Sequence, residues 1–433
     1  MKKKSSLFVY IYYILLLTIF FSRPGEVEPS MMMRLLFVGA VIVPTFFVKE
    51  VNFAGVITFF YSMTIYGISY SYMPYTLSQY AYITIIVTII LLGWKNQTKK
   101  KTPPILIIIT AYVFFVNALN TFDSPNAHVI ENIFWGLLML CCIFQITDNK
   151  DKQSLSQLSI CFELAAILLS LLFFINREQY AVSYGKDGLE RSSWVDPNYF
   201  GMVIGMGVLC GGLNLFGFKK RTHSLSEIII DISTIIVSFP VLVLNASRGA
   251  ILAVAVGLSI LLIFSKTKTI YKSFVISLGI VGLFYLYNNH YFDLLEYRII
   301  EDESGGSGRI GIWESKLNAF SQEGIFQYFL GNGYYKGMSI TGRFQGFHNE
   351  YVGFLVEYGV IGELLLLYML YYPIKKAKKS IKDKNERIKV YVVILYLSTC
   401  FMTLEPFGLG IFTFFTFYFY GLMLAMNERI LSN

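Results

Sequence analysis

Three residues in the second half of the chain have side chains and surroundings suited to chemistry on a phosphate-bearing ligand. Arg248 lies between two apolar runs in LNASRGAILAVAVG, Arg309 opens the segment RIGIWESKLNAF, and His348 precedes another apolar run in FHNEYVGF. An arginine guanidinium stays charged and can bind phosphate through two parallel hydrogen bonds. Histidine is the side chain whose unperturbed pKa allows proton transfer near neutral pH. This combination indicates anion binding coupled to acid–base chemistry.

The elements that hold these residues are expected to lie in a membrane. Hydrophobic residues make up 55% of the 433 residues and charged residues 15%, and apolar runs of about 15 to 22 residues recur along the whole chain. Because backbone groups in hydrocarbon need internal hydrogen bonds and the runs lack the alternation of a barrel, the spans must be helices. The basic start MKKK and the apolar run after it are interpreted as an uncleaved first span. We predict a single integral membrane domain over residues 1–433.

The apolar runs predict an all-α, polytopic helical bundle of about fourteen spans, or twelve to fourteen if short segments are tilted, re-entrant or merged. The expected spans are 7–21, 31–48, 51–70, 79–94, 105–119, 128–147, 158–175, 197–218, 227–244, 249–264, 273–289, 350–372, 390–404 and 411–426.

The distribution of lysine predicts how these spans are oriented. Cytoplasmic loops carry an excess of Lys and Arg, and with the N-terminus inside every second loop of this chain is basic. Both termini are therefore expected in the cytoplasm, and the loops 176–196 and 290–349 outside it. The net charge of +8 follows from this topology and from contact with anionic lipids, so it requires no nucleic-acid partner.

Arginine and lysine are distributed differently on the two predicted sides. Cations on the inner side are mostly Lys, whereas those on the outer side are mostly Arg, namely Arg23, Arg34, Arg177, Arg191, Arg248, Arg298, Arg309 and Arg343. Lys suffices as a solvated topological charge, but the planar guanidinium matches phosphate, so a phosphate ligand is expected outside. The alternative for each single Arg is that it caps a helix or extends to the membrane surface.

The outer segments place these arginines at expected helix starts. Arg191 lies just ahead of Asp196 and Pro197, a pair typical of the beginning of a helix. Arg248 lies at or below the membrane surface, where a charge is costly without a partner and therefore marks a functional candidate. Arg309 begins an amphipathic helix, which could lie along the membrane interface, with apolar residues at helical spacing: Ile310, Trp313, Leu317 and Phe320.

Two further groups of residues leave alternatives open. His348 could be a helix cap or an interface residue instead of a base, and Glu357 in the next span could either orient His348 or pack between helices. Glu163 and Glu405 have no role that the sequence assigns. The acidic cluster Glu301–Glu303 could hold a divalent ion, but it lacks histidine and is more typical of a solvated turn. The cysteines and histidines show no metal-ligand spacing, and no metal or cofactor is expected.

The motifs SRGA, GRIGIW, GNGYY and HNEYVGFLVEYGVIG, in this order, resemble the O-antigen polymerase and ligase superfamily, the membrane glycosyltransferases of the Wzy and WaaL type. The likeness covers about residues 190–372 and implies a GT-C-like helical bundle with a large outer loop. It implies that Arg248, Arg309 and His348 act in catalysis. Arg191 lies where such proteins often carry another basic residue, although its surroundings match less well. The expected substrate-binding set is Arg191, Asn349, Glu357 and Arg343.

The resemblance also implies the substrate. The donor would be a glycan on a polyprenyl diphosphate such as undecaprenyl diphosphate, so Arg248 and Arg309 would stabilise the diphosphate as it leaves. His348 would remove the proton of an acceptor hydroxyl, and direct displacement would invert the anomeric centre. Lipid-linked donor and acceptor and membrane lipids are the expected partners, with a flippase and a chain-length regulator as candidate partner proteins.

Three functions remain open at this point. The first is a polymerase that joins lipid-linked repeat units of a capsule, O-antigen or exopolysaccharide at the outer face of the bacterial cytoplasmic membrane. The second is a ligase that moves the finished glycan to another acceptor. The third, from a different class, is a lipid-linked oligosaccharide flippase, which would be expected to show repeated halves and charges deep within spans. The concentration of Arg and His outside the spans favours an enzyme.

Overall fold

The computed structural model describes residues 104–120, 153–176, 181–184, 189–192, 197–216, 225–300, 308–382 and 384–405. The predicted spans 7–21, 31–48, 51–70, 79–94, 128–147 and 411–426 lie outside these residues. The chain divides into two compact units, one formed by Met1–Thr98 and Gln145–Glu296 and the other by Lys99–Phe144 and Tyr297–Asn433.

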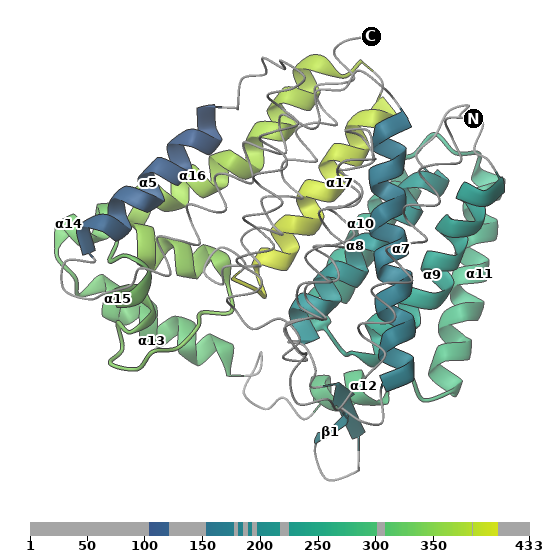
Figure 1. Cartoon of the computed structure of the whole chain (residues 1–433), viewed down its shortest axis with the longest axis horizontal. Helices are drawn as coiled ribbons and strands as arrows, with labels where there is room; N and C mark the ends of the chain where they lie inside the picture. The colour runs from purple at the N-terminus through teal and green to yellow at the C-terminus, as the bar shows by residue number, and fades with distance from the viewer. Residues whose placement is uncertain are drawn as a thin grey trace, which may run out of the picture. The chain divides into compact units, whose positions relative to one another are not determined.

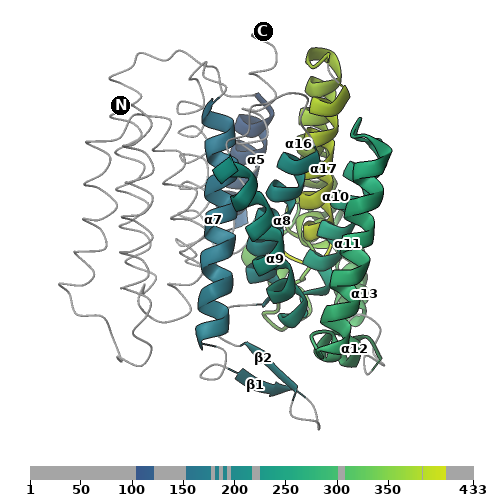
Figure 2. The ribbon, with the colours of Figure 1, turned by 90° about the vertical axis from the view of Figure 1, so that its right-hand side faces the viewer.

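In the first unit, helices pack around α8 (Pro197–Phe216). Its neighbours are α7 (Gln153–Asn176), α9 (Leu225–Leu244) and α10 (Arg248–Phe264), as Figures 1 and 2 show. Glycines on α8 permit this approach, because a Cβ at Gly207 would overlap Ala166 of α7 and one at Gly212 would overlap Leu258 of α10. Small residues at such contacts let helix backbones approach closely. In lipid this close packing matters because no hydrophobic effect drives helices together.

A polar contact inside this bundle joins three helices. The side-chain amide of Asn214 on α8 donates to Glu163 Oε1 of α7 at 2.7 Å and to Asp231 Oδ1 of α9 at 3.0 Å. Both acidic residues are buried. The Glu163 carboxylate, which the sequence left without a role, is therefore part of the packing of α7 against its neighbours.

The predicted outer loop 176–196 contains a hairpin. Strands β1 (Ala181–Tyr184) and β2 (Leu189–Ser192) pair antiparallel, with Val182 opposite Arg191 (Figure 2). After α11 (Thr269–Asn288), the short helix α12 (Asp293–Ile300) packs Leu294 and Leu295 against Ala246. This contact anchors the chain segment that follows α11 to the turn between α9 and α10.

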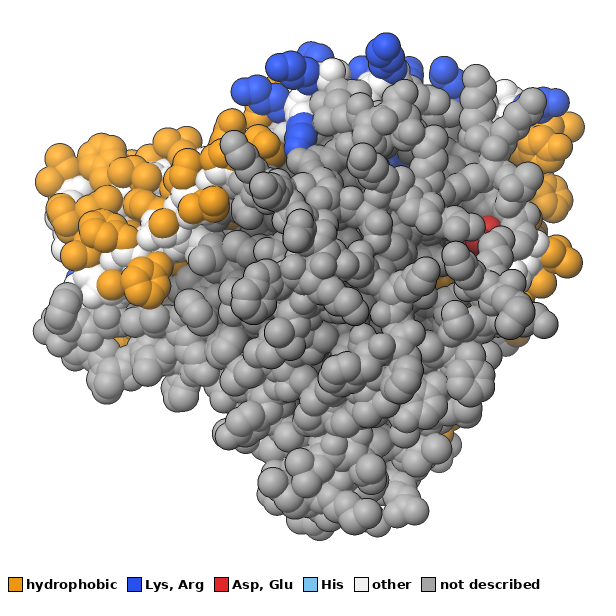
Figure 3. Space-filling view, turned by 45° about the horizontal axis from the view of Figure 1, so that its top comes forward, with side chains coloured by type: hydrophobic (Ala, Val, Ile, Leu, Met, Phe, Trp, Pro, Cys, Tyr) orange, Lys and Arg blue, Asp and Glu red, His pale blue; other side chains and the backbone are white. Residues whose placement is uncertain are grey.

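The second unit is organised by one long helix, α16 (Glu350–Ser380). Helices α5 (Pro104–Asn120) and α17 (Lys384–Phe401) pack against its length, and α13 (Arg309–Ser321), α14 (Ile325–Leu330) and α15 (Tyr334–Met338) pack near its N-terminal end. Exposed hydrophobic side chains cover α5 and α16, as Figure 3 shows in orange, with Lys and Arg side chains grouped beyond one end of this surface. The last turn of α16 carries Lys378 and Lys379.

Every predicted span that falls on described residues overlaps a helix. Among these helices, α8, α9, α11 and α16 are long and apolar enough to cross a membrane. The chain is therefore a helical membrane protein, while the count of about fourteen spans and their orientation stay predictions.

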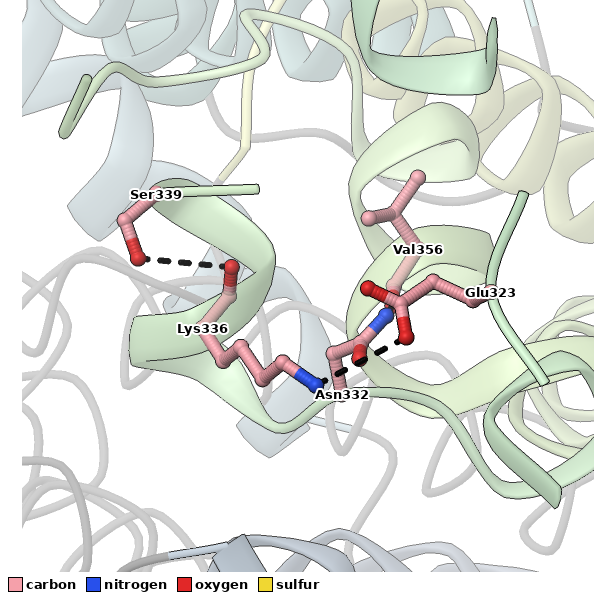
Figure 4. Close-up of polar contacts among 5 residues, drawn as sticks. All are labelled: Glu323, Asn332, Lys336, Ser339 and Val356. Carbon is pink, nitrogen blue, oxygen red and sulfur yellow. Dashed lines mark hydrogen bonds and ion pairs between the residues drawn. The ribbon is translucent and has the colours of Figure 1, made fainter. Parts of the chain in front are cut away.

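Helix α16 is broken at Gly359, whose φ of 65° lies in the left-handed region. The break frees carbonyls that would otherwise be paired within the helix, and other segments supply the donors. Gly333 N donates to Glu357 O at 2.8 Å, and the Tyr112 hydroxyl of α5 donates to Tyr358 O at 2.9 Å. Asn332 donates to Val356 O from its backbone and, at 3.5 Å, from its side chain (Figure 4). The α14–α15 connection is thereby fixed to α16.

Replacing Gly359 with alanine is expected to lower the free energy of unfolding by about 1–3 kcal/mol, because the residue would be held at positive φ. Its Cβ would also overlap the Phe329 carbonyl. The measurement is the thermal unfolding midpoint of the purified protein in detergent. Gly282→Ala is the control, since a Cβ there meets no atom of the described residues within 4 Å, and equal midpoints for the two variants would contradict the prediction.

Candidate active site

A buried ammonium group lies at the centre of the predicted outer loop. Lys316 of α13 is 1% exposed, and its Nζ donates to Met338 O at 2.6 Å, to Gln345 O at 2.7 Å and to Gly337 O at 3.4 Å. The same nitrogen lies 4.1 Å from the centre of the Phe347 ring. A charge can be buried when its donors are satisfied, and the carbonyls and the ring face accomplish that here.

Apolar residues surround this ammonium group. Phe320, Met338, Phe347 and Val356 form a buried cluster, with Leu317 packed against it. The apolar face of α13 is thus used within its own unit, although Ile310 at its start remains exposed. Leu317 and Phe320 pack against Met338, Phe347 and Val356. The expectation that this helix lies along the membrane interface stays a prediction.

The turn that carries His348 has an unusual backbone conformation and is held by backbone hydrogen bonds. His348 has a φ of 52°, an unusual value for a residue with a side chain, and it is half-buried. Both backbone polar groups of the preceding residue, Phe347, are hydrogen-bonded to side chains. Its N–H donates to Glu405 Oε2 at 2.8 Å, and its carbonyl accepts a hydrogen bond of 2.7 Å from Trp313 Nε1.

Arg309 is the first residue of α13, as predicted, and follows Gly308 at a φ of 73°. Its Nη1 donates to Thr403 O at 3.1 Å. Arg309 and Trp313 are one helical turn apart and therefore share a face of α13. Because Trp313 contacts the residue next to His348, the structure brings Arg309 and His348 into the same small region of the second unit.

Asn349 follows His348 and caps α16. Its Oδ1 accepts hydrogen bonds from Tyr351 N at 3.0 Å and Val352 N at 3.2 Å, an arrangement that satisfies two amides of the first turn. The N-terminal end of α16, which is the positive end of its dipole, therefore comes directly after His348 and Asn349 in the chain. The expected role of Asn349 in substrate binding stays a prediction beside this capping role.

The other two candidates of this unit occupy different environments. Arg343 is exposed on the segment between α15 and His348, where a ligand can reach it. Glu357 is 5% exposed on α16, and its Cγ occupies the space that a Cβ on Gly337 would fill. Glu357 therefore contributes to the packing of α15 on α16, and its binding role stays a prediction.

Charges in this region influence each other. Burial lowers the pKa of Lys316 below its ordinary value, while Glu357 and Glu405 oppose the change. Burial likewise raises the pKa of Glu405, opposed by hydrogen bonds from the Phe347 and His348 backbone and by the positive charges of Lys316 and Arg309. Arg309 and Glu405 thus belong to one electrostatic group around the His348 turn.

The two candidates of the first unit lie near starts of helices. Arg248 is the first residue of α10 and is partly exposed, next to the turn in which Ala246 has a φ of 48°. The side-chain amide of Asn245 in this turn donates to the carbonyl of Pro197, the first residue of α8. Arg191 belongs to β2, five residues ahead of the Asp196–Pro197 pair. Convergence of Arg248 with Arg309 and His348 stays a prediction.

Metal binding has no candidate within the described part of the chain, where no group of three or more His, Cys, Asp or Glu residues could hold an ion. The acidic cluster Glu301–Glu303 lies outside the described residues.

Lys316→Met is expected to reduce the free energy of unfolding by about 2–3 kcal/mol, because buried carbonyls would lose their charged donor. The measurement is again the thermal midpoint in detergent. Lys336→Met serves as the control, since the Lys336 side chain is 51% exposed and pairs with Glu323 at 3.6 Å (Figure 4). The prediction is contradicted if both variants unfold at the wild-type temperature.

The geometry can now be set beside known proteins. Residues 233–367 match the family model Wzy_C, described as O-antigen ligase. This range runs from α9 into α16 and includes Arg248, Arg309 and His348, whereas Arg191 and Glu405 lie outside it. A comparison with curated proteins finds no match. This match covers less than half of the chain, and it supports the resemblance to the O-antigen polymerase and ligase superfamily.

Proposed function

We propose that this membrane protein is a glycosyltransferase that polymerises lipid-linked oligosaccharides. It would join polyprenyl-diphosphate-linked repeat units of a capsule, O-antigen or exopolysaccharide at the outer face of the bacterial cytoplasmic membrane. The family match supports a membrane enzyme of the O-antigen ligase or polymerase type. The choice of polymerase, the substrate and the side of the membrane are the parts that we propose.

The observation that carries the proposal is the arrangement of Arg309 and His348 in one unit. Arg309 begins α13 and His348 precedes α16, and the two are connected through Trp313, Phe347 and the segment that ends at Glu405. A permanent cation and a titratable imidazole in one region match what the transfer needs. The cation would stabilise the negative charge on the leaving group, and the imidazole would remove the proton of the acceptor hydroxyl.

In the proposed reaction, the acceptor hydroxyl attacks the anomeric carbon of the donor sugar. His348 in its neutral form takes the hydroxyl proton as the new glycosidic bond forms. The bond between the anomeric carbon and the diphosphate oxygen breaks, and the electron pair leaves with the polyprenyl diphosphate. Arg309, together with Arg248, would stabilise the negative charge that grows on this group. A single displacement inverts the anomeric centre.

The two ends of α16 support an outer location of the reaction. His348 and Asn349 stand at its N-terminal end, while Lys375, Lys376, Lys378 and Lys379 stand at its other end, beyond an apolar stretch long enough to cross a membrane. Lysine-rich ends face the cytoplasm in most membrane proteins. His348 would then face the opposite side, where lipid-linked repeat units are available.

Two other functions are distinguished by their products. A ligase would use the same groups but transfer the glycan to a different acceptor lipid. A flippase would move the lipid-linked glycan without forming a bond, and the family match favours an enzyme over this possibility.

The purified wild-type protein is expected to elongate lipid-linked repeat units in vesicles, and His348→Ala and Arg309→Ala are expected to lose most of this activity. Loss of a general base typically slows a reaction about 10²–10⁴-fold. The measurement is the distribution of product lengths by gel or mass spectrometry. Translocation of the glycan without elongation would favour the flippase, and transfer to an added lipid acceptor would favour the ligase.

Arg248→Lys is expected to impair elongation much more than a conservative exchange usually does. A point charge cannot reproduce the two parallel hydrogen bonds that a guanidinium forms with a phosphate. Because Arg248 is at the beginning of α10 and partly exposed, the exchange should leave the fold intact. Product of nearly normal length from this variant would argue against a diphosphate contact at Arg248.

A further inference from the structure

A carboxylate from a distant part of the chain holds the His348 turn. Glu405 follows α17 and is 7% exposed. Its Oε2 accepts the hydrogen bond from Phe347 N at 2.8 Å, and the backbone of His348 also donates to this carboxylate. The residue lies outside the range of the family match, and the proposed reaction gives it no task.

Two successive backbone N–H groups of the turn donate to one carboxylate. Successive backbone N–H groups form a concave site for negative charge when one of the residues adopts the left-handed conformation. Phe347 and His348 supply the two N–H groups, and His348 has a φ of 52°. Such a φ is strained for a residue with a side chain and persists where contacts enforce it. The hydrogen bonds from Phe347 and His348 to the Glu405 carboxylate are contacts that can hold this backbone conformation.

Gly346 provides the space for this contact. A Cβ on Gly346 would overlap Glu405 Oε1, so a residue with a side chain there would displace the carboxylate. The absence of a side chain at position 346 is therefore part of how the carboxylate reaches the two amides.

The same chain segment also contacts Arg309. Thr403 accepts the hydrogen bond from Arg309 Nη1, and Glu405 follows Thr403 by two residues. One short segment after α17 thus fixes the backbone of the expected base and the side chain of the expected cation. We propose that Glu405 is a positioning residue that sets the orientation of His348 relative to Arg309, an inference that rests on the proposed transferase function.

The charges that face Glu405 come from three segments. Arg309 and Lys316 on α13 are cationic, Glu357 on α16 is acidic, and His348 is titratable on the turn itself. Removing the Glu405 carboxylate takes a negative charge away from His348 and so makes its imidazolium less stable. The pH at which elongation begins to fail on the acid side should then move downward.

The test compares Glu405→Gln, Glu405→Asp and Gly346→Ala in the full-length protein in vesicles, with Glu323→Gln as the control. Glu323 belongs to the same unit, pairs with the exposed Lys336 and contacts neither Arg309 nor His348 in any hydrogen bond or ion pair of the described residues (Figure 4). Elongation rate per folded protein is measured as a function of pH, and hydrogen exchange is measured at the amides of Phe347 and His348.

Glu405→Gln is expected to lower the rate about tenfold to a hundredfold, since charge-assisted hydrogen bonds are lost. It should also shift the acid limb to lower pH and speed exchange at the two amides. Gly346→Ala should lower the rate and speed exchange with a smaller shift of the limb, because the charge remains nearby. Glu405→Asp should recover part of the rate, and the control should match the wild type.

Two outcomes would overturn the inference. One is a wild-type rate and wild-type exchange in both Glu405→Gln and Gly346→Ala while His348→Ala is inactive, which leaves the proposed function standing. The other is a lower folded fraction with an unchanged acid limb, which would make Glu405 a residue of the fold alone. Full activity of His348→Ala, in contrast, would refute the proposed function whatever the exchange at the two amides shows.

Discussion

The buried ammonium group of Lys316 is the interaction on which the rest of the candidate site depends. Because this group is buried away from water, it needs protein acceptors for its hydrogen bonds. The carbonyls of Met338 and Gln345 must therefore lie within hydrogen-bond distance of it. Those carbonyls belong to the segment that leads to Phe347, whose ring also faces the ammonium. One charge therefore joins α13 to both ends of that segment, and this junction sets where Arg309 and His348 can be.

The break in α16 also helps to fix the position of the candidate site. A spanning helix with an interrupted hydrogen-bond pattern would be costly in lipid unless other groups satisfied the freed carbonyls. Here Gly333 and Tyr112 supply donors to Glu357 O and Tyr358 O. The loop of α13 to α15 is consequently fixed to α16, and the position of the turn before α16 is coupled to a helix that is long and apolar enough to cross a membrane.

Much of this arrangement could be predicted from local sequence, and the rest depended on distant pairs. The start of α13 at Arg309 and of α10 at Arg248 followed from apolar spacing after Gly or polar residues. Lys316 offered a signal that was not used, because it lies three residues after Trp313 and four before Phe320 and so falls on the apolar face of its helix. Glu405 offered none, since its partner Phe347 is 58 residues away and nothing in its neighbourhood indicates a contact.

The lysines and arginines of the predicted outer segments lie in different environments. Lys316 satisfies buried backbone carbonyls and so serves the fold, whereas Lys336 is exposed and pairs with Glu323 at 3.6 Å. Arg309 and Arg343 remain partly or fully exposed, whereas Arg298 is 9% exposed on α12 and is a packing residue. An ammonium group can be enclosed by single carbonyls, but a guanidinium presents a planar set of donors that a phosphate can use from one side. The shapes of the two cations therefore agree with the proposal that the accessible arginines contact the phosphate-bearing ligand.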